Sequence, residues 1–339
     1  MSGIDEAKVN IAKEKIEDFR DTFTRIKDEV HKFIVGQDHV IDGVLTALLS
    51  GGHALLEGVP GIGKTMLVKT LSKVLDLQFS RIQFTPDMLP ADILGSQVLE
   101  EDESGNNKIV FRKGPIVANL VLADEINRAT PKTQAALLEA MQEKQITVGN
   151  ETMPLPEPFI VLATQNPIEL EGTYPLPEAQ VDRFLLKINV GYPKEFEYHE
   201  IIRRTTEGRS PEINKIADPD KVIEMQKIVL DIPVPEQVRA YAIRLVLATQ
   251  PDSEHATEMT KRFVELGASP RGVQGLVLAG KVSALKDGRS AVSISDIKSV
   301  AYPVLRHRLI LKFEARAESV KPEDIIEKAI EAVPEVIEN

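Results

Sequence analysis

The sequence feature that most constrains the fold is a glycine-rich stretch at residues 58–65. It reads Gly58-Val59-Pro60-Gly61-Ile62-Gly63-Lys64-Thr65, which fits the pattern G-x-x-x-x-G-K-[ST] of a phosphate-binding loop. An apolar run at residues 54–56 precedes it, and a helical pattern at residues 66–75 follows it. Glycines let successive backbone N–H groups turn inward and surround phosphate oxygens at the start of a helix. We therefore expect a strand, a phosphate-binding loop and a helix in this order.

Two side chains at the end of this loop have separate expected roles. Lys64 is placed to reach the outer phosphates of ATP, and Thr65 is placed to offer its hydroxyl to Mg²⁺. The alternative is a chance glycine-rich turn, and the strand and helix on either side argue against it. The motif predicts a site for ATP and Mg²⁺.

A second motif is an apolar run that ends in two carboxylates. It reads Asn119-Leu120-Val121-Leu122-Ala123-Asp124-Glu125. In a parallel sheet such a strand points its last residues at the edge where open α/β folds bind ligands. We expect Asp124 to hold Mg²⁺, directly or through water, and Glu125 to polarise the water that attacks the γ-phosphate. An ordinary acidic helix cap is the alternative, and the phosphate loop upstream favours the catalytic interpretation.

A third apolar run, at residues 159–164, is followed by Asn166. An amide at the end of a strand is able to hydrogen-bond both the attacking water and a γ-phosphate oxygen, because it carries donors and an acceptor. Asn before Pro167 is also a routine turn signal, so a plain loop residue stays open as the alternative for Asn166.

Two arginines are further candidates for contact with nucleotide. Arg183 lies just before the apolar run at residues 185–190, and Arg271 follows Ser269-Pro270, a pair typical of a helix start. A cation in the first helical turn opposes the helix dipole unless an anion binds there. Surface arginine is the ordinary alternative for both.

The pattern along the whole chain predicts an α/β fold. Apolar runs at residues 53–57, 77–83, 119–124, 159–164 and 185–190 alternate with helical patterns, which indicates a parallel sheet with helices on both faces. Apolar residues near 5–33 recur every three or four positions, as on one face of an amphipathic helix. After residue 193 helical patterns predominate, near 195–206, 221–230, 235–249, 270–286, 296–311 and 323–332. We expect a small all-α domain there.

Composition limits the other kinds of site. The chain has 339 residues, no cysteine and six histidines without metal-ligand spacing, so any metal is expected to arrive with a ligand. The formal net charge of −11 disfavours a nucleic-acid partner, because the chain as a whole repels phosphate backbones. No long apolar run and no signal-peptide pattern is present, so we expect no membrane insertion and a cytoplasmic location.

Together these motifs resemble the AAA+ ATPases, and four longer stretches narrow the resemblance to the MoxR family. They are FTPDMLPADI at residues 84–93, ADEINRA at 123–129, ATQNPIE at 163–169 and GTYPLPEAQVDRF at 172–184. The resemblance covers nearly the whole chain. It implies an N-terminal helix at residues 1–33, an AAA+ nucleotide-binding domain at 34–192 and an all-α lid domain at 193–339.

The resemblance also implies roles for individual residues. Nucleotide contact extends over residues 58–66, ending at Met66, and Val35-Gly36-Gln37 borders the adenine. Asn166 takes the sensor 1 position, and Arg271 takes the sensor 2 position, in contact with the γ-phosphate of its own subunit. Arg183 takes the place of an arginine finger that acts in trans on a neighbouring subunit, as expected in the homo-hexameric rings usual for the family.

Two insertions typical of a subgroup are expected within the nucleotide-binding domain. The first is a helix-2 insert at about residues 92–115, with a polar turn at 99–107. The second is a pre-sensor-1 hairpin at about residues 143–158, around Gly149-Asn150. We expect these hairpins to contact substrate, with a plain solvated loop as the alternative for each.

The family role is an expectation by analogy. Relatives act as chaperone-like remodellers that activate client proteins or insert metal into them, often beside partners with a von Willebrand factor A domain. Alternatives are a DNA motor related to the minichromosome-maintenance helicases, the motor subunit of a metal chelatase, and a non-catalytic nucleotide switch. The acidic residues 100–103 argue against DNA, a neighbouring gene for a porphyrin-binding subunit would indicate a chelatase, and an intact Glu125 disfavours the switch.

Overall fold

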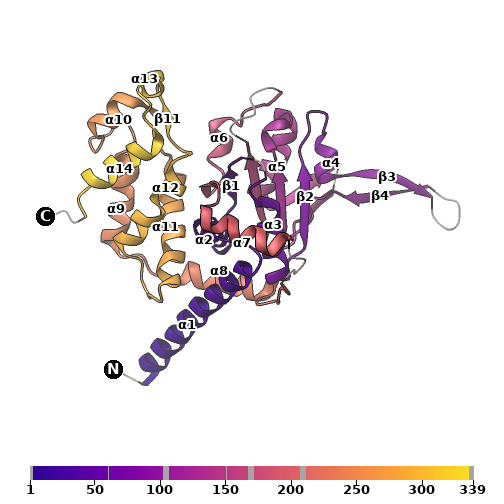
Figure 1. Cartoon of the computed structure of the whole chain (residues 1–339), viewed down its shortest axis with the longest axis horizontal. Helices are drawn as coiled ribbons and strands as arrows, with labels where there is room; N and C mark the ends of the chain where they lie inside the picture. Colours follow the sequence, from indigo (N-terminus) through magenta and orange to yellow (C-terminus); the bar gives the residue numbers. More distant parts are fainter. Residues whose placement is uncertain are drawn as a thin grey trace.

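The computed structural model describes residues 3–59, 61–101, 107–149, 151–166, 172–206 and 211–335, with side chains described from residue 13 onward. Two bodies face each other in Figure 1. The sheet and its helices form one, and the helices of the C-terminal third form the other. Pro60, Asn150 and residues 102–106, which include most of the predicted polar turn, lie outside the described residues.

Five parallel strands form the central sheet, in the order β2-β5-β8-β1-β9. They are β1 (Ala54–Glu57), β2 (Phe79–Gln83), β5 (Leu120–Asp124), β8 (Ile160–Gln165) and β9 (Leu186–Asn189). Each was predicted from its apolar run, and the predicted ends nearly coincide with the observed ones. Because β1 lies between β8 and β9, the carboxyl ends of β1, β5 and β8 are adjacent at one edge of the sheet.

Helices cover both faces of this sheet, which explains why the strands read as continuous apolar runs. Leu56, Leu122 and Leu162 pack on the face covered by α2 (Asp38–Leu49) and α3 (Lys64–Val74). Leu55, Val121 and Val161 pack on the opposite face with α4 (Pro90–Leu94) and α5 (Pro131–Glu143). The predicted α/β fold class is confirmed.

The C-terminal part is largely helical. Its helices are α8 (Pro219–Asp231), α9 (Glu236–Leu247), α10 (Glu258–Phe263), α11 (Pro270–Lys286), α12 (Ile294–Leu305), α13 (Phe313–Ala317) and α14 (Pro322–Ala332). A short antiparallel pair, β10 (Val264–Leu266) with β11 (Ile310–Leu311), adds a little sheet. The prediction of one helix over residues 296–311 was therefore wrong beyond Leu305, because residues 310 and 311 pair with a strand that is distant in sequence.

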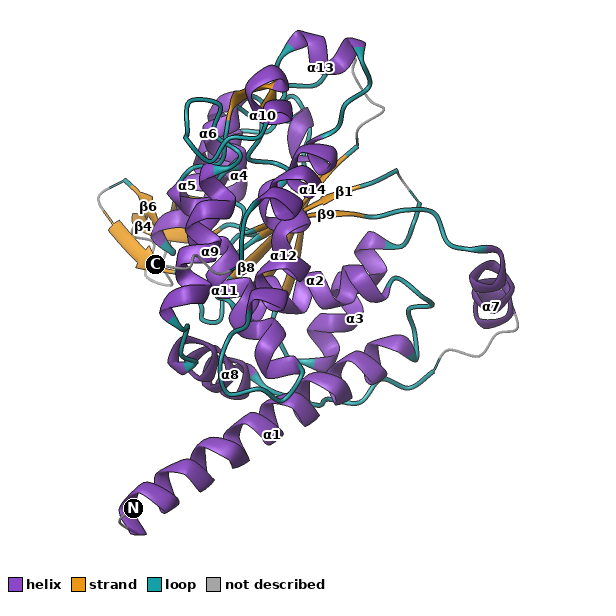
Figure 2. Cartoon of the chain, turned by 90° about the vertical axis from the view of Figure 1, so that its left-hand side faces the viewer, coloured by secondary structure: helices purple, strands orange, loops and turns teal. Residues whose placement is uncertain are grey.

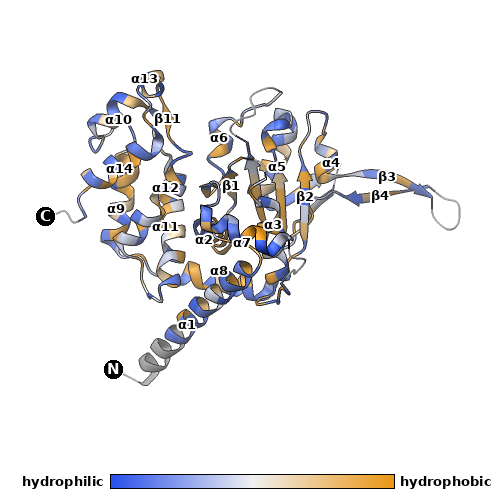
Figure 3. Cartoon of the chain, in the orientation of Figure 1, coloured by the Kyte–Doolittle hydropathy of each residue, from blue (hydrophilic) through white to orange (hydrophobic). Residues whose placement is uncertain are grey.

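The N-terminal helix α1 (Gly3–His31) buries the apolar stripe that was predicted for it. Figure 3 shows hydrophobic and hydrophilic residues mixed along its described half, as expected when one side is buried. Phe19, Phe23 and Ile26 belong to a core cluster that also holds one sheet face and residues of α8, α9, α11, α12 and α14. The C-terminal helices thus share a core with the nucleotide-binding domain. Within the described residues, no helix is long and apolar enough to cross a membrane.

Two hairpins and one helix extend from this body. The hairpin of β3 (Gly95–Glu101) and β4 (Asn107–Lys113) extends far from the sheet in Figure 1. The second hairpin joins β6 (Gln145–Val148) to β7 (Glu151–Pro154). Helix α7 (Glu195–Thr206) has no buried residue and stands apart in Figure 2. Its Arg204 donates to the carbonyls of His31 and Lys32 at 2.7 Å. The hairpins lie within the two predicted insertions.

His53, at the start of β1, gives the fold a specific sensitivity to acid. Its Nδ1 accepts the Val161 N–H at 2.9 Å and its Nε2 lies 3.0 Å from the Met141 carbonyl, an arrangement that suits the neutral ring. Burial lowers the pKa of His53 from 6.5 to about 4, with Lys144 adding to this effect and the Met141 carbonyl opposing it. The unfolded chain therefore binds one more proton between these two pH values. The contribution of the neutral His53 ring to the free energy of unfolding is therefore complete above pH 6.5 and is lost as the pH falls toward 4.

We expect His53→Gln to weaken the acid sensitivity of folding. Each pH unit in this window should change the free energy of unfolding by about 1.4 kcal/mol through His53, so its contribution between about pH 6.5 and pH 5 is about 2 kcal/mol. Urea unfolding at both pH values measures it. His199→Gln, at an exposed position of α7, is the control and should keep the wild-type dependence. An unchanged pH dependence in His53→Gln would contradict the assignment.

Candidate nucleotide-binding site

The loop between β1 and α3 has the backbone that the glycine pattern predicts. Gly61 and Gly63 have φ angles of 82° and 86°, and Gly63 is the N-cap of α3. Such positive φ values are easily reached by glycine alone. Lys64 then begins α3, and its Nζ donates to the Gly58 carbonyl at 2.6 Å, across the loop. The free N–H groups of the first helical turn lie at this loop, so it offers the donors that a phosphate group needs.

The acidic end of β5 is held by β8, its neighbour in the sheet. Glu125 has φ 57°, a left-handed conformation that is uncommon for residues other than glycine and costs on the order of 1 kcal/mol. Its N–H donates to Thr164 Oγ1 at 2.8 Å, and Thr164 Oγ1 donates to Asp124 Oδ1 at 2.7 Å. The backbone therefore turns sharply after Asp124, and both carboxylates stay at the sheet edge.

Strand β2 supplies two polar partners that sequence analysis missed. Gln83 Nε2 donates to Glu125 Oε2 at 2.9 Å, and the Arg81 guanidinium lies 2.6 Å from Asp124 Oδ2. Arg128 Nη1 adds a third contact, to Glu125 Oε2 at 3.0 Å. No motif marks Arg81 or Gln83. Their alternation along β2 is a usable signal only when β2 is known to pair with β5, where Gln83 lies opposite Asp124.

One cavity of about 360 Å³ is lined by the loop lysine, both carboxylates and Asn166. Its lining residues are Gly61, Gly63, Lys64, Thr65, Met66, Arg81, Asp124, Glu125, Thr164 and Asn166. Asn166 is buried and follows β8 directly. Burial lowers the pKa of Lys64, while the charges of Asp124, Glu125 and Glu57 act in the opposite direction. A cation, a helix N-terminus, a hydroxyl and two carboxylates thus meet in one cavity.

This set of groups fits a nucleoside triphosphate with Mg²⁺. The cation and the free N–H groups suit phosphate oxygens, and the oxygens of Thr65 and Asp124 are the hard ligands that Mg²⁺ prefers. Among the described residues, no cluster of three or more histidine, aspartate or glutamate side chains is arranged to hold a metal by itself. Phosphate oxygens would therefore complete the coordination.

One of the predicted adenine-side residues, Gln37, contacts the phosphate loop. Gln37 Nε2 donates to the Ile62 carbonyl at 2.9 Å, so the stretch before α2 lies against the loop. Gly36 lies against Glu197 of α7, where a Cβ would come within 1.9 Å of the carboxylate. Gln37 thus lies against the phosphate loop, and Gly36 lies against α7. Val59 packs against the main core cluster, and Pro60 lies outside the described residues.

The two predicted arginines are not among the residues that line this cavity. Arg183 Nη1 donates to the Leu138 carbonyl of α5 at 3.0 Å. Arg271 lies 3.4 Å from Asp182, and Ser269 accepts the Arg271 N–H as predicted for a helix start. The guanidinium of Arg271 thus pairs with Asp182, the residue before Arg183, and its expected contact with the γ-phosphate of its own subunit stays a prediction. The side chain of Arg183 is held by α5, and that of Arg271 by the residue that precedes Arg183.

Comparisons with protein-family models match the same two parts of the chain. The model described as the ATPase family associated with various cellular activities (AAA) matches residues 53–186, which include all the residues that line the cavity. The model described as the AAA lid domain matches residues 256–329, which include Arg271.

Individual relatives match almost the whole length. Chaperone MoxR1 of Mycobacterium tuberculosis is 45% identical over 312 residues, which cover 92% of this chain and 82% of the relative. Protein MoxR of Methylorubrum extorquens is 31% identical and covers 94% of this chain and 96% of its own. A crystal structure from Cytophaga hutchinsonii superposes with a TM-score of 0.89 at 43% identity, covering 96% of this chain and 98% of that one.

Proposed function

Because the chain belongs to the MoxR family of AAA+ ATPases, we propose that it hydrolyses ATP with Mg²⁺ in a ring of identical subunits and uses the energy to remodel a client protein. One observation carries the proposal. Lys64, Thr65, Asp124, Glu125 and Asn166 line a single cavity, whereas Arg183 of the same chain lies elsewhere. A site that is complete except for its arginine suits an enzyme completed by a second copy.

Five residues of the cavity have proposed parts in this hydrolysis. Bound ATP with Mg²⁺ supplies the phosphoryl group and neutralises part of its charge. Lys64 would bind the outer phosphates, and Thr65 and Asp124 would hold the metal. Glu125 accepts the proton of the attacking water, and its carboxylate is oriented by Gln83 and Arg128. Asn166 orients the same water through its amide.

Arg183 would supply the remaining charge from a neighbouring subunit. Arg183 would act as the finger that stabilises charge in the transition state of the adjacent site. Arg271, which pairs with Asp182 in this structure, would instead contact the γ-phosphate of its own subunit. We therefore propose that the catalytic sites lie between subunits of a homo-oligomeric ring. By analogy with the family, this ring would be a hexamer.

A mixing experiment tests this arrangement. Arg183→Ala should bind ATP with wild-type affinity and lose most turnover, because an arginine finger contributes about 10³–10⁵-fold to the rate. Adding Lys64→Ala subunits, which keep Arg183 but lack the phosphate-binding lysine, should restore part of the ATPase activity. Steady-state phosphate release across mixing ratios is the measurement. Absence of recovery at every ratio would contradict a finger that acts in trans.

The proposed client role rests on similarity. One relative of high identity is named a chaperone, and we propose a chaperone-like role here. Proteins with a von Willebrand factor A domain are candidates for the client. The β3–β4 hairpin is the proposed contact surface, because it extends far from the body and exposes Leu99 and Ile109 opposite each other.

A further inference from the structure

Arg308, three residues beyond the end of α12, is a buried arginine that the nucleotide cavity does not explain. Only 2% of its side chain is exposed. Its guanidinium Nε donates to Asp182 Oδ1 at 2.8 Å, and its Nη2 donates to the carbonyls of Phe184 at 2.8 Å and Asp182 at 3.3 Å. Its Nη1 donates to the carbonyls of Leu185 and Val304. Arg308 thus binds the segment 182–185 on both sides of Arg183.

The chemistry of this contact is specific to arginine. A guanidinium carries five N–H donors in a rigid plane, whereas a lysine ammonium is a single point with three. Burial lowers the pKa of Arg308 to about 10, although the Asp182 charge opposes this effect, so the group stays charged at neutral pH. A buried charge with this many backbone acceptors holds the segment in one position.

Asp182 also receives other groups from the C-terminal domain. Ser269 Oγ donates to Asp182 Oδ2 at 2.9 Å, and Arg271 lies 3.4 Å from the same oxygen. Three side chains of the lid therefore converge on the residue that precedes Arg183. The Arg183 segment belongs to the nucleotide-binding domain in sequence, where Arg183 binds the Leu138 carbonyl, but the side chains that bind Asp182 come from the lid.

We propose that Arg308 is a positioning residue for Arg183: it fixes the segment 182–185 against the lid, so that Arg183 is presented to the site of a neighbouring subunit. This inference rests on the proposed function. In this proposal, the lid of each subunit helps to complete the catalytic site of the next subunit. Arg308 does not touch nucleotide in this arrangement and acts through Arg183.

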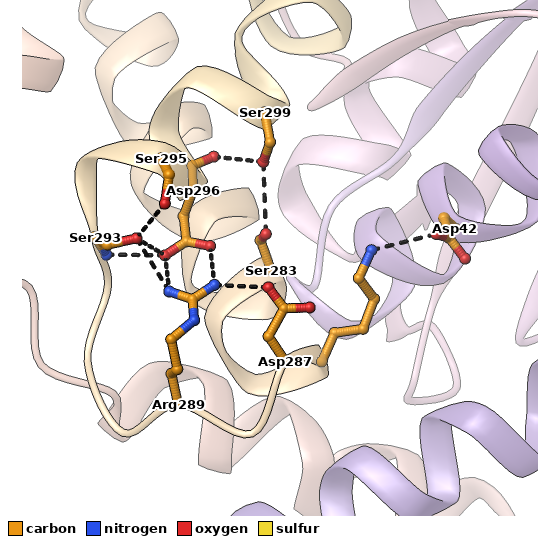
Figure 4. A network of polar contacts seen from close by, with 9 residues as sticks. Asp42, Ser283, Asp287, Arg289, Ser293, Ser295, Asp296 and Ser299 are labelled. Carbon is orange, nitrogen blue, oxygen red and sulfur yellow. Dashed lines mark hydrogen bonds and ion pairs between the residues drawn. The ribbon is translucent and has the colours of Figure 1, made fainter.

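The chain offers a matched control in Arg289. This lid arginine binds the buried Asp296 through both Nη atoms and also contacts Asp287 at 2.7 Å and Ser293 at 3.0 Å. Figure 4 shows the group enclosed by the turn between α11 and α12. Arg289 thus makes a comparable lid ion pair, with partners that all lie in the lid. Arg289→Lys reports the general cost of weakening such a pair.

The experiment compares Arg308→Lys and Arg289→Lys alone and in mixtures. Arg308→Lys should bind an ATP analogue with wild-type affinity and lose at least about tenfold in kcat, because the finger is displaced. Mixing it with Lys64→Ala should restore activity, since its intact ATP site then receives a well-placed Arg183. Mixing it with Arg183→Ala should restore nothing, since neither copy offers a working finger. Arg289→Lys should keep its kcat within about twofold.

Several outcomes would overturn the positioning role. One is wild-type turnover in Arg308→Lys. In another, Lys64→Ala subunits restore the ATPase activity of Arg183→Ala but not that of Arg308→Lys. Arg308 would then act on the ATP site of its own subunit or on folding in general. Asp182→Asn, which keeps the shape of its side chain, is the second variant and should recover in the same way. If Arg183→Ala itself never recovers, the proposed trans site fails before this inference is reached.

Discussion

Lys64→Ala is expected to weaken ATP binding by at least about a hundredfold, which corresponds to about 2.7 kcal/mol. Lys64 is the loop cation that lines the cavity, and it is half-buried beside two carboxylates. Without it, the phosphates would face Asp124 and Glu125 with less compensation, and the loss of a buried charge partner costs roughly 2–5 kcal/mol. A fluorescence titration with an ATP analogue measures the change.

Lys69→Ala is the control for this prediction. Lys69 lies on α3, one turn beyond the loop, and its side chain is exposed. The substitution removes the same charge from the same helix without reaching the cavity, so affinity should stay near the wild-type value. Equal affinities of Lys64→Ala and the wild type would mean that phosphates bind elsewhere, and the phosphate-loop assignment would fail.

Glu125→Gln is expected to keep ATP binding and to lose about 10²–10⁴-fold in turnover, the usual contribution of a general base. Glutamine has the shape of glutamate and still accepts from Gln83 and Arg128, so the left-handed turn at residue 125 should persist. It is not able to take the proton of the attacking water. Rapid measurement of ATP binding and steady-state phosphate release separates the two effects.

The control for Glu125→Gln is Glu139→Gln on the exposed side of α5. It makes the same chemical change away from the cavity and should leave turnover unchanged. Wild-type turnover in Glu125→Gln would show that another group activates the water. A loss of ATP binding in this variant would instead indicate that Glu125 shapes the cavity, in contrast to the proposed proton transfer.

Much of the fold was predictable because its signals are local. The five strands are short apolar runs, and the buried stripe of α1 recurs with the helical period. The phosphate loop is continuous in sequence, so its glycines, Lys64 and Thr65 are positioned by a few neighbouring residues. The carboxylates after β5 follow from strand direction alone, since parallel strands all end at one edge.

Other features depend on residues far apart in the chain. Arg81 and Gln83 reach the carboxylates only because β2 pairs with β5, and no motif states the strand order. The prediction of a helix after residue 305 was wrong for the same reason, since β11 is defined by its pairing with β10. The shared core of α1, the sheet and the lid also results from packing, which a residue pattern does not specify.

The sequence by itself determined the phosphate loop, its lysine, the two carboxylates and the class of fold, because backbone geometry and periodicity act over a few residues. Only the tertiary structure decided where the arginines lie. Asp182 draws Arg271 and the buried Arg308 to one corner of the molecule, beside Arg183 and away from the cavity of the same chain. Charge pairing between residues far apart in sequence, buried at Arg308 and partly exposed at Arg271, sets that position.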